Sequence, residues 1–199
     1  MTAIGGQRKP PQCPLRVESG HSRGYPRAMF LTDTDYQRAD WPLLQNGAVH
    51  LFWSRAVLSE TRDKLAELDY EASEIVFGSK APGFHAQMSS ALKWQEQFGY
   101  AFWNGNLDAL NDGMRHFPFG PSGRNALIFV GFHHFTSESP ETSHAILDII
   151  ECAARDHLLS GRLLLALVQT DDNRYVCPPV GARGVGWNPK EWMDRDRGL

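Results

Sequence analysis

Residues 126–132 read A-L-I-F-V-G-F, and residues 163–169 read L-L-L-A-L-V-Q. Both are nearly continuous apolar runs of strand length, a pattern typical of strands that are buried on both faces of a parallel sheet. Between them, residues 142–160 have apolar side chains at helical spacing, and Gly161 is the type of residue that ends a helix. The sequence therefore predicts a strand–helix–strand unit in which helices pack on a parallel sheet.

The same alternation of strands and helices extends towards the N-terminus. Short apolar runs predict strands, and apolar residues at spacings of three and four predict helices. Strands are expected at residues 49–53 and 73–77 and within 178–187, and helices at residues 57–68, 84–94 and 106–117. The expected fold class is therefore α/β: a parallel sheet of three core strands, an additional N-terminal strand and a C-terminal edge strand, packed with helices.

Composition divides the chain into four segments. Residues 1–28 are rich in glycine and proline, and we expect a disordered tail because they cannot bury enough apolar surface to offset the entropy of ordering. Met29 is an alternative start of the chain. Residues 29–70 are expected to add a strand and a helix to the main domain, which spans residues 71–170. Residues 171–199 are expected to hold the edge strand and a C-terminal tail.

Charge and cysteine content argue against several classes of protein. With 20 Lys and Arg against 23 Asp and Glu, the formal net charge is −3, which fits a basic protein partner better than direct binding of nucleic acid. Cys13, Cys152 and Cys177 are widely spaced and form no C-x-x-C motif, so we expect no disulfide framework and a cytoplasmic location. We also expect no membrane span, signal peptide, metal or cofactor.

The most informative segment, residues 98–114, reads F-G-Y-A-F-W-N-G-N-L-D-A-L-N-D-G-M. An aromatic loop leads into Asn106, whose side-chain oxygen is suited to cap the first turn of a helix. Asp108 then lies in that first turn, where the helix dipole favours a negative charge. The apolar residues of this helix recur at core spacing, which leaves an outward arc formed by Asp108, Asn111, Asp112 and Arg115.

Two acidic residues on this arc, Asp108 and Asp112, lie one helical turn apart. Such a like-charge pair costs an isolated helix about 0.2–0.5 kcal/mol, so the helix gains no stability from it. On residue types alone, the pair indicates a solvated helix face on which Asp112 pairs with Arg115 or His116.

The segment also resembles the signature of a known family. Residues 106–112, N-L-D-A-L-N-D, preceded by F-W-N-G at residues 102–105, are similar to the aromatic loop and N-L-D-A-L-x-D motif of the barstar (barnase inhibitor) family. The resemblance covers residues 71–170, where the expected elements follow in the family's order. It implies a fold with a three-stranded parallel sheet packed with helices. It also implies that the protein is not an enzyme but an inhibitor of a small, basic, guanyl-specific ribonuclease of the barnase type.

The resemblance also implies a set of partner-binding residues. In the family, the aromatic loop and the following helix enter the active site of the ribonuclease. The position that matches Asp112 supplies a carboxylate where the substrate phosphate would lie, and the position that matches Asp108 adds a second negative charge. The remaining residues of the implied contact surface are Phe102, Asn104, Asn106 and Asn111. The loop departs from the family pattern at Phe102 and Asn104, where tyrosine and glycine are usual.

Other functions remain alternatives. The same fold can serve as an interaction module with a partner other than a ribonuclease. A small hydrolase would use His133 and His134, which follow a predicted strand, although two such histidines are more often ordinary loop residues. The loop aromatics can stack RNA bases, but no Lys or Arg alternates with them. Cys152, on an apolar helix face, is expected to be a core residue.

Overall fold

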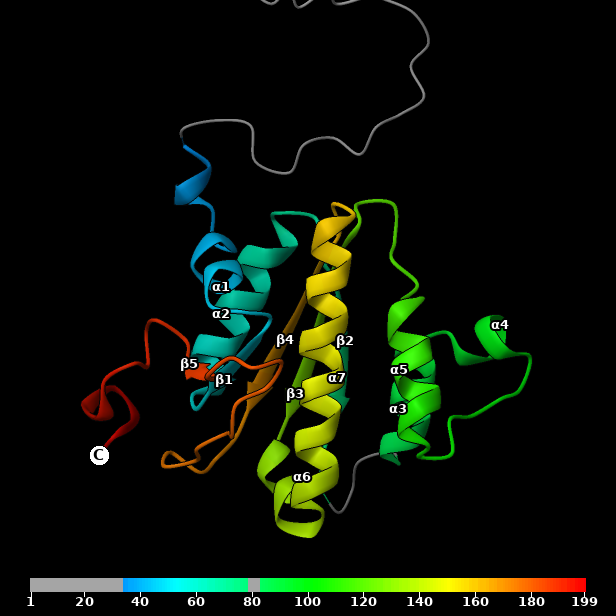
Figure 1. Ribbon diagram of the computed structural model, residues 1–199. Helices are drawn as coiled ribbons and strands as arrows, with labels where there is room; N and C mark the ends of the chain where they lie inside the picture. The colour runs from blue at the N-terminus through cyan, green and yellow to red at the C-terminus, as the bar shows by residue number, and fades with distance from the viewer. Residues whose placement is uncertain (1–33, 79–82) are drawn as a thin grey trace, which may run out of the picture.

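A parallel sheet forms the centre of the computed structural model, which describes residues 34–78 and 83–199 (Figure 1). Its strands lie in the order β2-β3-β4-β1-β5, and every pair is parallel. The predicted α/β class with a parallel sheet is therefore confirmed. The strands are β1 (Val49–Phe52), β2 (Glu71–Val76), β3 (Arg124–Val130), β4 (Leu163–Gln169) and β5 (Gly186–Trp187). The predicted tail at residues 1–28 and the alternative start at Met29 lie outside the described residues.

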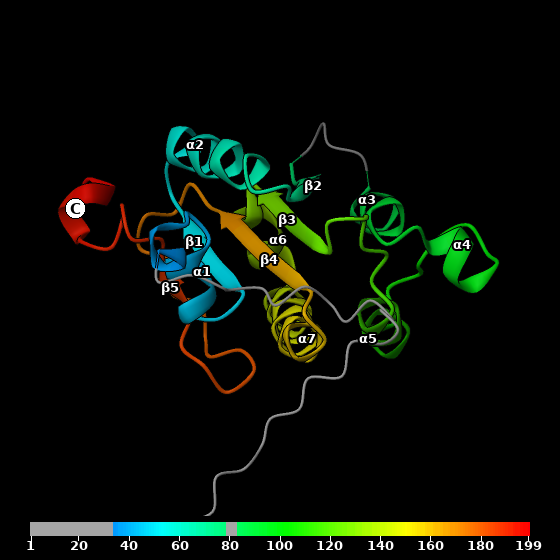
Figure 2. The same ribbon diagram turned by 90° about the horizontal axis from the view of Figure 1, so that it is seen from above.

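Helices cover both faces of this sheet. Figure 2 shows α2 on one face and α7 on the opposite face, with α5 beside α7. The α-helices are α1 (Trp41–Gln45), α2 (Arg55–Ala66), α3 (Phe84–Ala91), α4 (Trp94–Phe98), α5 (Leu107–Arg115), α6 (Phe132–Glu138) and α7 (Pro140–Leu159); the short 3-10 helices are η1 (Asp35–Gln37) and η2 (Asp194–Arg197).

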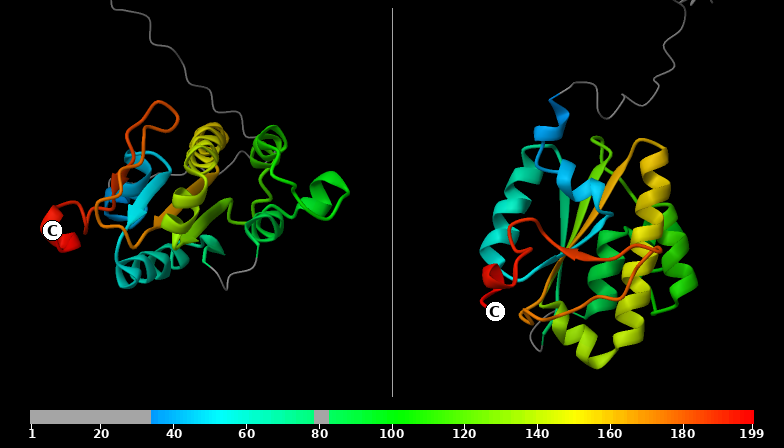
Figure 3. Two further views of the ribbon diagram at one scale, coloured as in Figure 1. Left: turned by 90° about the horizontal axis from the view of Figure 1, so that it is seen from below. Right: turned by 60° about the vertical axis from the view of Figure 1, so that its left-hand side comes forward.

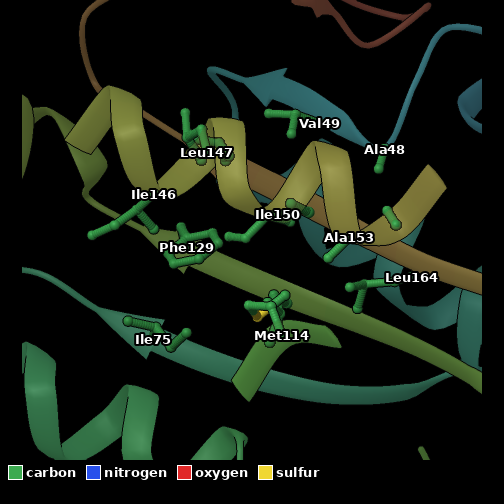
Figure 4. Packing of buried hydrophobic residues seen from close by; sticks show 14 of the residues in the cluster. Ala48, Val49, Ile75, Met114, Phe129, Ile146, Leu147, Ile150, Ala153 and Leu164 are labelled. Atoms are coloured by element: carbon green, nitrogen blue, oxygen red, sulfur yellow. The ribbon is translucent and has the colours of Figure 1, made fainter. Parts of the chain in front are cut away.

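The double burial of β3 and β4 explains their continuous apolar sequences. Successive side chains of a strand point to opposite faces, so Ile128 belongs to the core on the α2 side and Phe129 to the core on the α7 side. Figure 4 shows Phe129 beneath Ile146 and Ile150 of α7. Each large apolar side chain that is fully buried in this way contributes about 1.5–3 kcal/mol.

Two of the differences from the predicted boundaries have a cause in the backbone conformation of a single residue. Gly131 adopts a left-handed conformation with φ +74°, so the strand predicted at residues 126–132 ends at Val130 and Phe132 begins α6, which was not predicted. Lys93 has φ +47°, so the helix predicted at residues 84–94 ends as α3 at Ala91, and a separate helix that was not predicted, α4, begins at Trp94. An unfavourable conformation of a single non-glycine residue has no clear signature in sequence periodicity.

The C-terminal residues are held by buried polar groups. Of the predicted edge strand, only Gly186–Trp187 pairs with β1. Beyond it, Glu191 is 1% exposed, and its carboxylate accepts hydrogen bonds from the backbone N–H groups of Trp53 (3.1 Å) and Ser54 (2.7 Å). The guanidinium of Arg197 lies over the ring of Trp187, 4.6 Å from its centroid. These contacts attach the segment to the start of α2 and to the sheet.

His50 is a buried titratable group in β1. Its Nε2 lies 2.8 Å from the carbonyl oxygen of Leu43 and 3.1 Å from that of Gly47, so Nε2–H donates to the backbone of the α1–β1 connection. Burial lowers the pKa of His50, because the charged imidazolium loses its hydration.

His50 should therefore make stability depend on pH. The pKa of His50 is lower in the folded than in the unfolded chain. The contribution of neutral His50 to the free energy of unfolding is therefore fully present above the unfolded pKa of 6.5, and it is lost as the pH falls below that value. We expect the free energy of unfolding, measured with urea between about pH 7 and about pH 5, to decrease more steeply for the wild type than for His50→Gln. Equal pH dependence of the two proteins would exclude His50 as the cause.

Candidate partner-binding surface

The predicted binding segment lies at one side of the sheet, beyond strand β2. Figure 1 shows α3, α4 and α5 grouped there, and Figures 2 and 3 show α4 at the outer limit of this group. Residues 99–106 connect α4 to α5, so the aromatic loop and the acidic helix are consecutive in space as well as in sequence. We call residues 99–106 the aromatic loop.

Trp103 anchors the aromatic loop to the core. Its side chain is 1% exposed, its backbone N–H donates to Ser89 Oγ of α3 (2.8 Å), and its indole Nε1–H donates to the carbonyl oxygen of Asn106 (2.6 Å). Ser89 Oγ in turn donates to the carbonyl oxygen of His85 (2.6 Å). Gly105 adopts φ +95°, and a Cβ there would lie 3.2 Å from Nε2 of His85. These contacts fix the loop against α3 while its polar residues remain at the surface.

Asn106 caps α5, as the sequence predicted. Its Oδ1 accepts hydrogen bonds from the N–H groups of Asp108 (2.9 Å) and Ala109 (3.1 Å), which have no partner within the helix. Asn104 supports the cap, because its Oδ1 accepts a hydrogen bond from the N–H of Asn106 (3.1 Å). Two of the residues predicted to bind the partner therefore also determine where the helix begins.

The inner face of α5 packs closely against α4 and the core. Leu110 and Met114 are completely buried. Gly113 allows the close approach, because a Cβ at this position would lie 2.9 Å from the ring of Trp94. With this face fixed, Asp108 and Asp112 point outward and are exposed.

The two carboxylates form no ion pair with any other described residue. Nδ1 of His116 lies 3.0 Å from the backbone carbonyl oxygen of Asp112, not from its carboxylate. Arg115 likewise forms no ion pair within the described part of the chain. The pairing of Asp112 with Arg115 or His116 that the residue types indicated is therefore not found among the described residues, and both acidic side chains are exposed to solvent.

The other predicted residues lie on the same loop and helix. Phe102 is 62% exposed, Asn104 and Asn106 are exposed, and Asn111 is half-buried. Tyr100, which was not among the predicted binding residues, is 48% exposed in the same loop. Periodicity gives no means of distinguishing it from a packing aromatic, since loops have no repeating inward face.

Two residues outside the loop, Cys152 and His133, differ in environment from what the sequence suggested. Cys152 is exposed rather than in the core, because α7 turns the neighbouring Glu151 inward instead. Glu151 accepts a hydrogen bond from the N–H of Ala48 (2.6 Å), so it adds no negative charge to the aromatic-loop surface. His133 lies in α6 rather than in a loop, and its Nδ1 accepts from the N–H of Asp171 (3.2 Å).

The described residues contain no cluster of three or more metal-binding side chains. Within the same residues, no helix is both long and apolar enough to cross a membrane.

Ser89 provides a test of how the aromatic loop is held. In Ser89→Ala, the buried N–H of Trp103 loses its acceptor, so we expect the free energy of unfolding to fall by about 1–3 kcal/mol. The amide of Trp103 should also exchange with solvent faster. Ser90→Ala, an exposed neighbour on the same helix, is the matched control and should change stability by less than about 0.5 kcal/mol. Similar losses for the two variants would show that Ser89 does not hold the loop.

Comparison with known families agrees with this geometry. Residues 78–169 match the model of the family described as Barstar (barnase inhibitor). Comparisons with curated proteins and with solved structures found no match. The matched segment begins after β2, ends with β4, and includes the aromatic loop and α5. The chain therefore carries a domain of the barstar family.

Proposed function

We propose that the protein is an inhibitor that binds and blocks the active site of a small guanyl-specific ribonuclease, and that it acts in the cytoplasm. The observation that carries this proposal is the pair of exposed carboxylates, Asp108 and Asp112, which lie one turn apart and have no ion pair with another described residue. They are presented on a capped helix beside Phe102, which is 62% exposed. Membership of the barstar family supports the same activity and argues against an enzyme.

The chemistry of such a complex follows from the target. A ribonuclease site gathers Arg, Lys and His side chains to hold phosphate, and a carboxylate can accept charge-assisted hydrogen bonds from the same groups. The N-cap at Asn106 and the buried anchor at Trp103 fix the helix before binding. Less conformational freedom is then lost on association, which increases affinity.

Charge around the site has the sign that a basic partner requires. Among residues 69–115 of the sequence, six acidic residues stand against three basic ones at positions 80, 93 and 115. An acidic excess of three attracts a basic protein at long range and accelerates the encounter. Phe102 adds an exposed aromatic side chain, the type of residue that forms the buried centre of many interfaces.

Inhibition of RNA cleavage tests the proposal directly. The protein would be titrated into a panel of barnase-type ribonucleases, and we expect stoichiometric inhibition of at least one of them. Asp112→Ala should weaken inhibition by roughly 30-fold or more, because cationic groups of the enzyme lose a charged acceptor on binding. Glu67→Ala is the matched control, since it removes the same charge at the exposed end of α2 and should change inhibition by less than about 3-fold.

The outcomes separate the possible functions. No inhibition of any ribonuclease by the wild type would contradict the proposal and favour an interaction module of the barstar fold with another partner. Equal weakening by the two substitutions would show that net charge matters and that the helix α5 surface does not.

Salt dependence provides a second test. Between about 0.01 M and about 0.5 M salt, we expect the association rate constant to fall at least roughly tenfold and the dissociation rate constant to change much less, because screening acts on the long-range encounter. Stopped-flow mixing with the inhibited ribonuclease measures both. An association rate that is independent of salt would contradict a contribution of the acidic excess to the encounter.

A further inference from the structure

A cavity of about 650 Å³ adjoins β5, at the edge of the sheet that lies farthest from the aromatic loop. Its walls come from Asn46 and His50 on one side and from residues between Gly184 and Met193 on the other, at the left of Figure 1. Each lining residue and its neighbours in sequence belong to the described part of the chain. Cavities of about 300–1,000 Å³ commonly hold small ligands.

Exposed apolar side chains form the outer wall of this cavity. Trp192 is 67% exposed, and Met193 beside it is 50% exposed. The ring of Trp192 lies against the sheet edge, because Gly186 has no side chain and a Cβ there would be 3.3 Å from Cζ3 of the ring. Trp187 is half-buried and adds a second indole to the same cavity. An exposed apolar patch beside polar groups is typical of a ligand-binding groove.

Two polar side chains that line the cavity have an unused hydrogen-bond acceptor. Nδ2 of Asn46 donates to the carbonyl oxygen of Pro42 (2.9 Å), which leaves Oδ1 without a partner in residues 34–78 and 83–199. His50 is 3% exposed, and its Nε2–H already donates to the backbone, so Nδ1 is an acceptor without a partner in the same residues. Burial lowers the pKa of His50, which keeps the ring neutral and Nδ1 able to accept. A buried acceptor costs free energy unless a donor reaches it.

The two indole groups add donors to the same surface. Nε1–H of Trp187 and Nε1–H of Trp192 donate to no other residue in the described part of the chain. A hydroxyl group both donates and accepts hydrogen bonds, so a ligand with several hydroxyl groups matches both kinds of site. The cavity is open at Trp192, so the outer groups of such a ligand stay in water and keep their hydration.

We propose that this cavity binds a carbohydrate. One face of a pyranose ring consists mainly of C–H groups, and this face packs on the indole ring of Trp192. Hydroxyl groups at the rim of the sugar donate to Oδ1 of Asn46 and to Nδ1 of His50. None of the six residues proposed to bind the ribonuclease lines this cavity, and β5 lies at the opposite edge of the sheet from β2. The two ligands can therefore bind at the same time.

Calorimetric titration of the full chain with maltopentaose, cellopentaose and chitotriose tests the proposal. Sorbitol is the control ligand, because it has hydroxyl groups but no ring. We expect saturable binding of at least one oligosaccharide and no binding of sorbitol. Trp192→Ala should weaken binding at least roughly tenfold (about 1.4 kcal/mol). Tyr36→Ala is the matched control variant, since Tyr36 is a comparably exposed aromatic residue outside the cavity, and it should leave binding unchanged.

A second variant fills the cavity and separates loss of binding from loss of folding. A Cβ at Gly184, which lines the cavity, would meet no atom within 4 Å, so Gly184→Trp places an indole in open space. This variant should abolish binding while its circular dichroism remains that of the wild type. Absence of saturable binding by all three oligosaccharides, or binding that neither Trp192→Ala nor Gly184→Trp reduces, would overturn the proposal. Equal binding of sorbitol would contradict recognition of a sugar ring. Because no ribonuclease is present, the result is independent of the proposed inhibition.

Discussion

The parallel pairing of β3 with β4 is the interaction on which the rest of the structure depends. Both strands are buried on both faces, and the register places Leu127 beside Ala166 and Phe129 beside Val168. In such a pair the backbone N–H and C=O groups bond to the neighbouring strands, because a buried group left without a partner would cost free energy. The helices on the two faces can therefore pack on a surface that has little freedom to shift.

The candidate surface is made rigid in the same way, through a short series of contacts. Met114 of α5 packs in the same core as Phe129 of β3, and Figure 4 shows both near α7. Trp103 connects the core to the aromatic loop, because its indole N–H donates to the carbonyl oxygen of Asn106. Asn106 in turn connects the loop to the first turn of α5, because its Oδ1 accepts a hydrogen bond from the N–H of Asp108. The carboxylate of Asp112 is thus presented from a fixed backbone, although its own side chain contacts solvent.

Sequence periodicity predicted the parts of the fold that depend on burial. The strand at residues 163–169 has the predicted limits, and α5 begins after its predicted cap at Asn106, because apolar spacing and cap chemistry are both local properties. The break at Lys93 was not predictable, since tertiary packing holds a left-handed conformation that the residue itself disfavours. Helix α6 was missed for a related reason: Gly131 ends β3 inside a continuous apolar run.

Prediction of the candidate surface was limited in a different way. The acidic residues and the cap follow from residue types, and the family motif indicated their shared role. The hydrogen bond that holds the aromatic loop to α3 could not be predicted. Ser89 is separated from Trp103 by thirteen residues, and the sequence does not indicate which group a helical serine binds. The inward position of Glu151 was equally hidden, since its partner is the backbone of Ala48, more than a hundred residues earlier in the chain.

The attachment of Glu191 to the start of α2 has a consequence for how the chain can be divided. Strand β1 pairs with β4 on one side and with β5 on the other, and Glu191 fastens the residues after β5 to the residues after β1. A fragment cut to residues 78–169 would lack both β1 and β2. It would leave the long apolar edges of β3 and β4 unpaired, and such edges associate with those of other molecules. The flanking segments thus occupy the two strand edges through which the isolated family domain would otherwise associate.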